Sequence, residues 1–117
     1  MRKAFLKIAI LFGLAASLVF GQTAHSVALT WTDTANPAGT TYSIYRATGQ
    51  CTGSLTFTKI SAAPVAAKTY TDNSVQPGPY CYVATATFNA IESGYSNSAL
   101  AAVPTSPPNS LTITTIQ

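Results

Sequence analysis

Three segments of this sequence alternate apolar and polar residues with a period of two. They are residues 27–31, residues 42–46 and the longer stretch 80–103. Because successive side chains of a β-strand point to opposite faces, this period indicates strands with one buried face. Shorter runs of the same kind recur at intervals of roughly 8–12 residues, separated by turn-forming residues. The pattern predicts an all-β domain built as a sandwich of two sheets.

The first 21 residues have the parts of a secretory signal peptide. Arg2, Lys3 and Lys7 supply positive charge, and residues 8–20 form an apolar run. That run is shorter than the roughly twenty residues that span a bilayer comfortably. We therefore expect cleavage before Gln22 and export to the periplasm or the cell exterior. The alternative is an uncleaved anchor, which would be the chain's one link to a membrane.

Removal of this segment would take away half of the six Lys and Arg residues. The charges that remain, three basic and three acidic, sum to zero: Arg46, Lys59, Lys68, Asp33, Asp72 and Glu92. No basic patch remains to attract nucleic acid or an anionic membrane surface. We therefore expect no nucleic-acid partner.

The two cysteines are placed for a disulfide. Cys51 follows the strand predicted at residues 42–48, and Cys81 lies near the start of the strand predicted from residue 80. If these strands are antiparallel neighbours, the two Cα atoms can approach the roughly 4.4–6.8 Å that a disulfide requires. A metal pair or reactive thiols are the alternatives, but His25 is the one histidine and lies far away in sequence. We predict a Cys51–Cys81 disulfide, no metal site and no cofactor.

The same alternation sorts the aromatic residues into two groups. Six occupy positions that predict a core location: Trp31, Tyr42, Phe57, Tyr70, Tyr80 and Tyr82. Tyr45, Tyr95 and Phe88 occupy outward or loop positions. Tyr45 and Tyr95 are candidate ligand contacts, because exposed aromatic rings can stack on sugars, although cross-strand packing is the commoner role of such pairs.

The carboxylates do not form a catalytic pattern. Asp33 and Asp72 lie where strands are predicted to end and are expected to cap turns. Glu92 is expected to be a solvated turn residue, and His25 is expected to be exposed at the mature N-terminus. The dispersed acidic residues make a poor calcium loop. We predict that the protein is not an enzyme.

Five motifs in register resemble a fibronectin type III domain over residues 27–103. They are Val27-x-Leu29-x-Trp31, Tyr42-Ser43-Ile44-Tyr45-Arg46, Thr69-Tyr70-Thr71-Asp72, Tyr80-Cys81-Tyr82-Val83-Ala84-Thr85-Ala86 and Glu92-Ser93-Gly94-Tyr95-Ser96-Asn97. The resemblance implies a seven-stranded Greek-key, immunoglobulin-like sandwich with three strands packed on four, in a domain spanning residues 22–103. It also implies that Tyr80 is the corner tyrosine, whose hydroxyl pins the preceding turn.

Two departures from the family pattern limit what the resemblance implies. The turn at residues 89–92 carries no Arg-Gly-Asp triplet, so integrin-type adhesion is not carried over. The expected cleavage site lies only a few residues before the strand at 27–31, so the first strand of the family, strand A, is expected to be missing.

The residues after 103 form a separate tail, 104–117. Residues 104–108 are a Pro-rich linker, and residues 110–116 form an alternating, β-prone run. Residues 107–112 resemble the opening strand of another such domain. This run could supply the missing strand in its own domain or pair with a neighbouring molecule. A frayed tail is the alternative.

Together these features predict a non-catalytic, secreted binding or spacer module. It would act by protein–protein contacts at the cell envelope or outside the cell. The alternative is a carbohydrate-binding module that uses its outer-face aromatics. The partner would then be an extracellular protein or a polysaccharide, and self-association through the tail is a further possibility.

Overall fold

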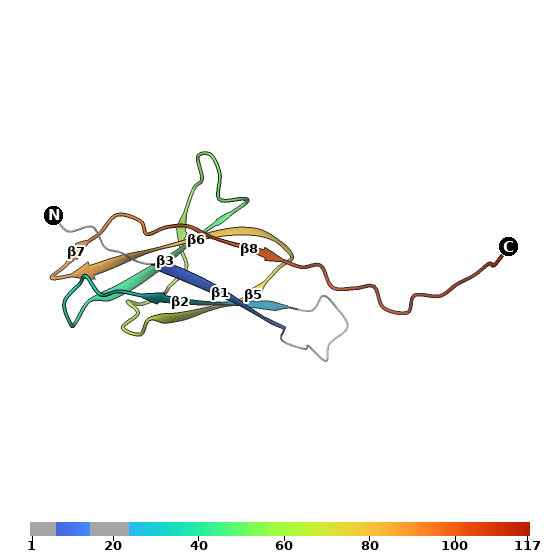
Figure 1. The fold of residues 1–117 in the computed structure, drawn as a ribbon, viewed down its shortest axis with the longest axis horizontal. Helices are drawn as coiled ribbons and strands as arrows, with labels where there is room; N and C mark the ends of the chain where they lie inside the picture. The colour runs from blue at the N-terminus through green and yellow to red at the C-terminus, as the bar shows by residue number, and fades with distance from the viewer. Residues whose placement is uncertain (1–6, 15–23) are drawn as a thin grey trace.

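The computed structural model describes residues 7–14 and 24–117. Within these ranges the chain forms eight strands and no helix (Figure 1). They are β1 (Lys7–Leu14), β2 (His25–Thr32), β3 (Thr41–Thr48), β4 (Thr58–Lys59), β5 (Thr69–Val75), β6 (Gly78–Phe88), β7 (Ile91–Glu92) and β8 (Ala99–Val103). The all-β prediction is confirmed.

The strands pair antiparallel in two sheets. One sheet has the order β1-β2-β5, and the other has the order β4-β3-β6, with β7 and β8 both paired to β6. β7 lies beside the end of β6, where Phe88 pairs with Ile91, and β8 lies beside its beginning, where Gly78 pairs with Val103. If β7 and β8 are read as one interrupted strand, three strands face four, as the family resemblance implies.

The two sheets bury a common core between them. Side chains from β2, β3, β5, β6 and β8 meet there: Val27, Leu29, Trp31, Tyr42, Ile44, Val75, Tyr82, Ala84, Ala86, Ala101 and Val103. Trp31 and Tyr42 pack edge to face across the sheets, with ring centroids 5.3 Å apart. Such a pair adds to the stabilisation from burial alone, because the edge of one ring is attracted to the face of the other.

A buried carboxylate ties the two sheets together. Asp72 on β5 is 8% exposed and accepts hydrogen bonds from the Tyr82 hydroxyl (2.6 Å) and Arg46 Nη1 (2.8 Å). Both partners lie on the opposite sheet. The buried carboxylate therefore has a cation and a hydroxyl donor to offset the cost of its burial. The prediction that Asp72 caps a turn at a strand end is wrong, because β5 continues to Val75, which pairs with His25.

Tyr82, rather than Tyr80, makes the hydroxyl contact back to the preceding strand. The ring of Tyr80 is half-buried at the margin of the core and lies 5.3 Å from the Arg46 guanidinium carbon. Tyr70 is also half-buried against the core, and its hydroxyl donates to the Ile60 carbonyl (3.0 Å). The corner role predicted for Tyr80 is therefore corrected: it stacks with Arg46 and leaves Asp72 to Tyr82.

Phe57 departs from its predicted core position. Its ring packs against Tyr95, with centroids 5.3 Å apart, while Ile60 packs on the core instead. Around residues 55–60 the structure has the two-residue strand β4, and the amide of Ile60, just after it, donates to the Ile44 carbonyl (2.8 Å). Phe57 is thereby left on the outer side of the sheet.

The edge beside β2 is neither empty nor filled by the tail. β1 pairs along all of β2, from Lys7 opposite Thr32 to Leu14 opposite His25, and Ile8 packs against the core. The prediction that strand A is missing, or is supplied by the tail of the same domain, is wrong for the chain with residues 7–14 in place. Among the described residues, 104–117 form no strand and extend away from the sandwich (Figure 1).

A two-residue loop joins β6 to β7. Asn89 and Ala90 both have positive φ, 50° and 62°. This is the conformation of a type I′ hairpin turn, whose twist matches that of the strands it joins. Asn tolerates the left-handed region, but the Cβ of Ala is disfavoured there.

We expect Ala90→Gly to stabilise the protein by about 0.5–1 kcal/mol, because it removes this strain from the folded state at a smaller entropic cost. The gain should raise Tm by a few degrees in thermal denaturation followed by circular dichroism. Ala102→Gly, in the extended β8, is the matched control and should lower Tm. A lower Tm for Ala90→Gly would contradict the assigned turn.

Candidate functional site

The outer face of β6 is buried although it points away from the core. Cys81, Val83 and Thr85 alternate with the core residues of this strand and are all at most 2% exposed. The loop between β3 and β4 and the segment between β7 and β8 lie over them, and their side chains line a shallow cavity of about 240 Å³ together with Cys81 and Val83. An extra layer of chain therefore covers the middle of this face.

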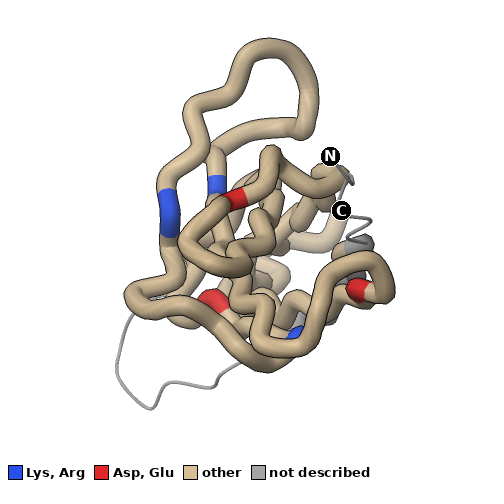
Figure 2. The backbone as a smooth tube through the Cα atoms, turned by 90° about the vertical axis from the view of Figure 1, so that its left-hand side faces the viewer, with Lys and Arg blue, Asp and Glu red and all other residues tan. Residues whose placement is uncertain are grey.

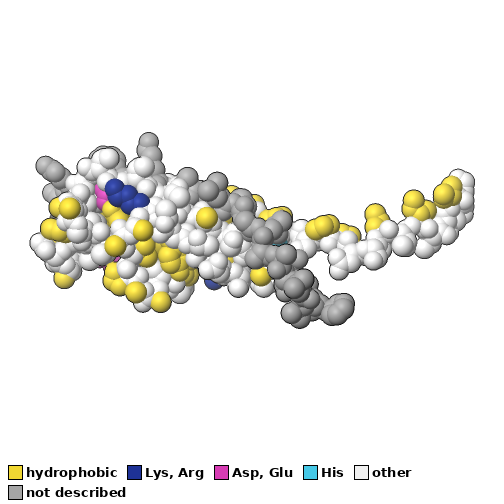
Figure 3. Space-filling model, turned by 90° about the horizontal axis from the view of Figure 1, so that it is seen from below, with side chains coloured by type: hydrophobic (Ala, Val, Ile, Leu, Met, Phe, Trp, Pro, Cys, Tyr) yellow, Lys and Arg dark blue, Asp and Glu magenta, His cyan; other side chains and the backbone are white. Residues whose placement is uncertain are grey.

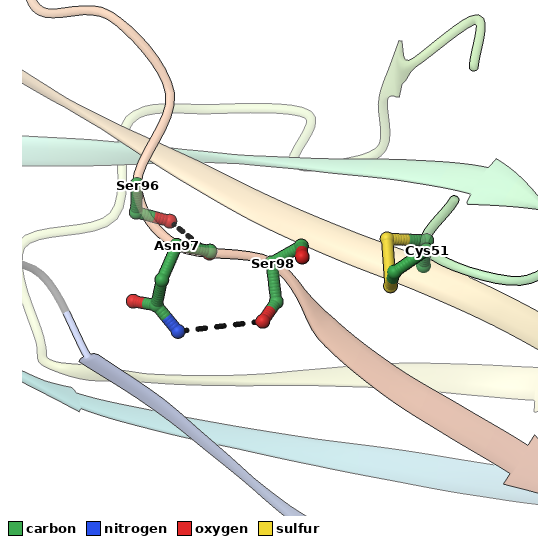
Figure 4. The surroundings of a disulfide bond; sticks show 5 residues. Cys51, Ser96, Asn97 and Ser98 are labelled. Atoms are coloured by element: carbon green, nitrogen blue, oxygen red, sulfur yellow. Dashed lines mark hydrogen bonds between the residues drawn. A yellow bond between two sulfur atoms is a disulfide. The ribbon is translucent and has the colours of Figure 1, made fainter. Parts of the chain in front are cut away.

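A disulfide attaches the first of these covering segments to the sheet. Cys51, in the loop after β3, bonds to Cys81 on β6, with Cα atoms 5.2 Å apart (Figure 4). The predicted disulfide is confirmed, and both cysteines of the sequence are used. Because Cys81 is completely buried, the disulfide holds the loop against the sheet rather than at its rim.

Two serines attach the second covering segment. The amides of Ala86 and Ala84 on β6 donate to Ser93 Oγ and Ser96 Oγ, both at 2.9 Å. The amides of the same two serines donate back to the carbonyls of Ala86 and Ala84, both at 2.8 Å. The two β6 amides are thus bound by serine hydroxyls, where a regular neighbouring strand would offer backbone carbonyls. The chain bulges between them and carries Tyr95 outward.

Three aromatic rings gather where the covering segments meet, and we call them the aromatic cluster: Tyr45, Phe57 and Tyr95. Tyr95 packs on Tyr45 with centroids 5.2 Å apart and planes inclined by 66°, and on Phe57 at 5.3 Å and 55°. Tyr95 is 55% exposed, whereas Tyr45 and Phe57 are half-buried. The two predicted ligand contacts, Tyr45 and Tyr95, therefore lie side by side, and Tyr95 is the more accessible.

Glu92 holds the base of the aromatic cluster. Its Oε2 accepts hydrogen bonds from the hydroxyls of Thr85 and Tyr45, both at 2.6 Å. The bond from Thr85, followed by that from Tyr45, lowers the pKa of Glu92, and the same contact with Glu92 raises the pKa of Tyr45. Glu92 is exposed, as expected, but it lies in β7 rather than in the turn, and its carboxylate also binds Tyr45 on β3 and Thr85 on β6.

An open cavity of about 260 Å³ lies next to this carboxylate. It is lined by Tyr45, Thr85, Glu92, Ser93, Gly94 and Tyr95. An aromatic ring, a carboxylate and hydroxyl groups therefore face one small volume. The geometry allows an apolar side chain or a polar ring to bind there.

Asp33 organises the loop between β2 and β3. Its Oδ1 accepts the amides of Ala35 and Asn36, and its Oδ2 accepts Asn36 Nδ2 (2.7 Å) and the Tyr42 hydroxyl (2.8 Å). Burial raises the pKa of Asp33, but these hydrogen bonds outweigh it and hold the pKa below 3.8. Burial, then the bond to Asp33, raises the pKa of Tyr42 to about 12. The predicted turn-capping role of Asp33 is confirmed.

His25 departs from its prediction. It is 3% exposed on β2, rather than exposed at a chain end. Neither its Nε2 nor Trp31 Nε1 has a hydrogen-bond partner among the described residues.

The charged residues are dispersed over the domain, and Arg46 and Asp72 form an ion pair between the two sheets. Figure 2 shows acidic and basic positions interspersed over the domain. In residues 7–14 and 24–117, no three His, Cys, Asp or Glu side chains come close enough to hold a metal ion. The same part of the chain contains no helix that is long and apolar enough to cross a membrane.

The lowered pKa of Asp33 predicts a pH-dependent contribution to stability. The contribution is complete above the ordinary pKa of 3.8 and is lost as the pH falls toward the lower folded-state value. Asp33→Asn should therefore lower the free energy of unfolding by about 1–3 kcal/mol near neutral pH. Urea denaturation at about pH 7, 4 and 2 should show this difference shrinking on acidification. Thr34→Ala, in the same loop, is the control and should have little effect; a difference that does not change with pH would contradict the role of Asp33.

Comparison with known proteins places this geometry in a family. No protein-family model matches the sequence, and the search of curated proteins found no significant match. Among solved structures, the chain is similar to an Fn3-like protein from Clostridium thermocellum, with a TM-score of 0.53 and 30% sequence identity. The match covers 86% of this chain and 99% of that protein. Together with the two-sheet topology and the five motifs, it shows that this chain belongs to the fibronectin type III-like family.

Proposed function

We propose that this protein is an exported, non-catalytic module that binds a protein partner through the aromatic cluster and the cavity beside it. The fibronectin type III-like fold is generally an interaction module and is generally non-catalytic, which supports the first part of the proposal. A fold alone does not specify a partner, so the second part rests on the site.

The observation that carries the proposal is the exposure of Tyr95 on a firmly held bulge. Ser93 and Ser96 fasten the chain on both sides of Tyr95, and the rings of Tyr45 and Phe57 support it from below. A rigid, half-exposed tyrosine supplies contact area at a low cost in side-chain entropy. Tyrosine is accordingly enriched among the residues that contribute most to protein–protein binding.

Carbohydrate binding is the second candidate, and one observation favours it. The Glu92 carboxylate lies at the same cavity as the Tyr95 ring, and this combination can bind the polar rim and the apolar face of a sugar. The planes of the Tyr45 and Tyr95 rings are inclined by 66°. This supports protein binding over carbohydrate binding, because a flat platform for stacking on a sugar requires nearly coplanar rings. The half-burial of Tyr45 supports it as well.

Export is supported by the composition of residues 1–21 and by the disulfide. Structural disulfides persist in oxidising compartments and are rare in the cytosol. The proposed cleavage before Gln22 would separate β1 from the rest of the domain.

The export proposal predicts a defined intact mass. Protein produced from the full chain in the native host should have a mass that begins at Gln22. Its cysteines should react with an alkylating reagent only after reduction, because Cys51 and Cys81 are paired. Mass spectrometry with and without reduction measures both. A mass that includes Met1 would refute cleavage, and free thiols would refute an oxidising location.

The binding proposal predicts that a photoreactive residue at position 95 captures a protein. The probe should form a discrete protein adduct when the variant replaces the native chain in its host. The matched control is the same probe at Thr71, which is exposed on β5 in the opposite sheet and should give no such adduct.

Tyr95→Ala is the companion variant, since it removes the ring and leaves the serine attachments in place. It should weaken binding of the captured protein at least tenfold in a titration. Equal capture at positions 95 and 71 would contradict the proposed surface. Depletion of the wild-type protein by an insoluble polysaccharide, abolished by Tyr95→Ala, would favour the carbohydrate alternative.

A further inference from the structure

β1 closes a seam between the two sheets. It pairs with β2 along that strand's full length and also lies against β8 of the other sheet. β8 contributes Ala101 and Val103 to the core, and β2 contributes Val27, Leu29 and Trp31. β1 therefore covers both the hydrogen-bonding edge of β2 and the side of the core at this seam.

The proposed export would remove this cover, because β1 lies within residues 1–21. β2 would then have β5 on one side and an open edge on the other. Residues 25–32 contain no Lys, Arg, Asp, Glu or Pro, which are the residues that usually protect an open edge from pairing. The edge of the cleaved protein would therefore be a template for another strand.

The tail has the features of a strand that could fill this edge. Leu111, Ile113 and Ile116 are 88%, 80% and 87% exposed. Leu111 and Ile113 alternate with threonines, and residues 104–117 carry no charged side chain. Figure 3 shows apolar side chains spaced along the tail, well away from the sandwich. A β-prone segment with exposed apolar side chains gains by pairing with an open edge.

The direction of the tail favours an edge on another molecule. Val103, the last residue of β8, pairs with Gly78, the first residue of β6. β5, the strand before β6, ends at Val75, which pairs with His25, the first residue of β2. The tail therefore leaves the sandwich at the end where β2 begins. To reach its own β2, the tail would have to reverse immediately after β8, through a linker that contains three prolines. Prolines stiffen such a linker in an extended form. The molecule's long axis of 69 Å reflects a tail that points outward instead (Figure 1).

We infer that, in the exported protein, residues 111–116 of one copy pair with the open edge of β2 in a second copy. This inference rests on the proposed cleavage before Gln22. The tail takes the place that β1 holds in the full-length chain, with Leu111 and Ile113 turned toward the core and Thr112 turned outward. Because donor and acceptor are different surfaces of the chain, the contact is heterologous and builds chains or closed rings of copies.

The test uses the full chain with its own leader, recovered from outside the cytoplasm of a producing cell. Intact mass reports cleavage, and light scattering after size exclusion reports the assembly state over a range of concentrations. We expect a cleaved protein with at least twice the monomer mass at high concentration. Ile113→Lys places a charge on the side facing the core and should give a monomer. Thr112→Lys adds the same charge on the outer side and should still assemble.

A photoreactive residue at Thr112 identifies the acceptor. Mixed with isotope-labelled protein, it should cross-link to residues 25–32 of the other isotopic form. Cross-links within one copy, a cleaved wild-type monomer, or equal assembly of the two lysine variants would overturn the inference. If the mass includes Met1, the export proposal fails, and the inference falls with it; a cleaved monomer would overturn the inference and leave export standing.

Discussion

The hydrogen bond from Tyr82 to Asp72 is the contact on which the arrangement of the two sheets depends. Tyr82 lies in the middle of β6, fully buried, and Asp72 belongs to the facing sheet. A buried carboxylate is costly unless it is paired, so the two sheets are held where Tyr82 and Arg46 can both reach it. Sliding one sheet by a residue would break both contacts. The position of β6, and of everything attached to its outer face, follows from this constraint.

The outer face of β6 shows how a small domain can make a rigid site without a cleft. The disulfide holds one loop against Cys81, and the hydroxyls of Ser93 and Ser96 hold the opposite segment. Between them the aromatic cluster rests on Glu92, whose carboxylate joins three strands through Tyr45 and Thr85. These attachments reduce the conformational entropy that binding would otherwise cost, which is why this face is the best candidate for a partner.

The seam at β2 has a different character. In the full-length chain it is closed by β1, whose apolar residues also have the composition of a signal peptide. One segment can satisfy both descriptions, because a β-strand and the apolar region of a signal peptide each require a short run of apolar residues. In our proposal, processing of the chain links export to the opening of an edge, and assembly follows from the need to cover it.

The sequence by itself determined the strands of the core. The period of two in residues 27–31, 42–46 and 80–86 decides which side chains are buried, and the same period placed Trp31, Tyr42 and Tyr82 between the sheets. The spacing of Cys51 and Cys81 around two paired strands was enough to predict their disulfide. These features are readable because each depends on residues close together in sequence or on one strand pairing.

Only the tertiary structure decided the contacts made by polar side chains and irregular segments. Asp72 and Glu92 find their partners on other strands, and Phe57 moves outward because Ile60 takes the inner position. The serine attachments at residues 93 and 96 have no period that would reveal them, since a serine bonded to an amide looks like any turn serine. The edge beside β2 could not be assigned from local pattern either. Its occupant depends on which apolar segment is present to compete for it, and that competition is settled in three dimensions.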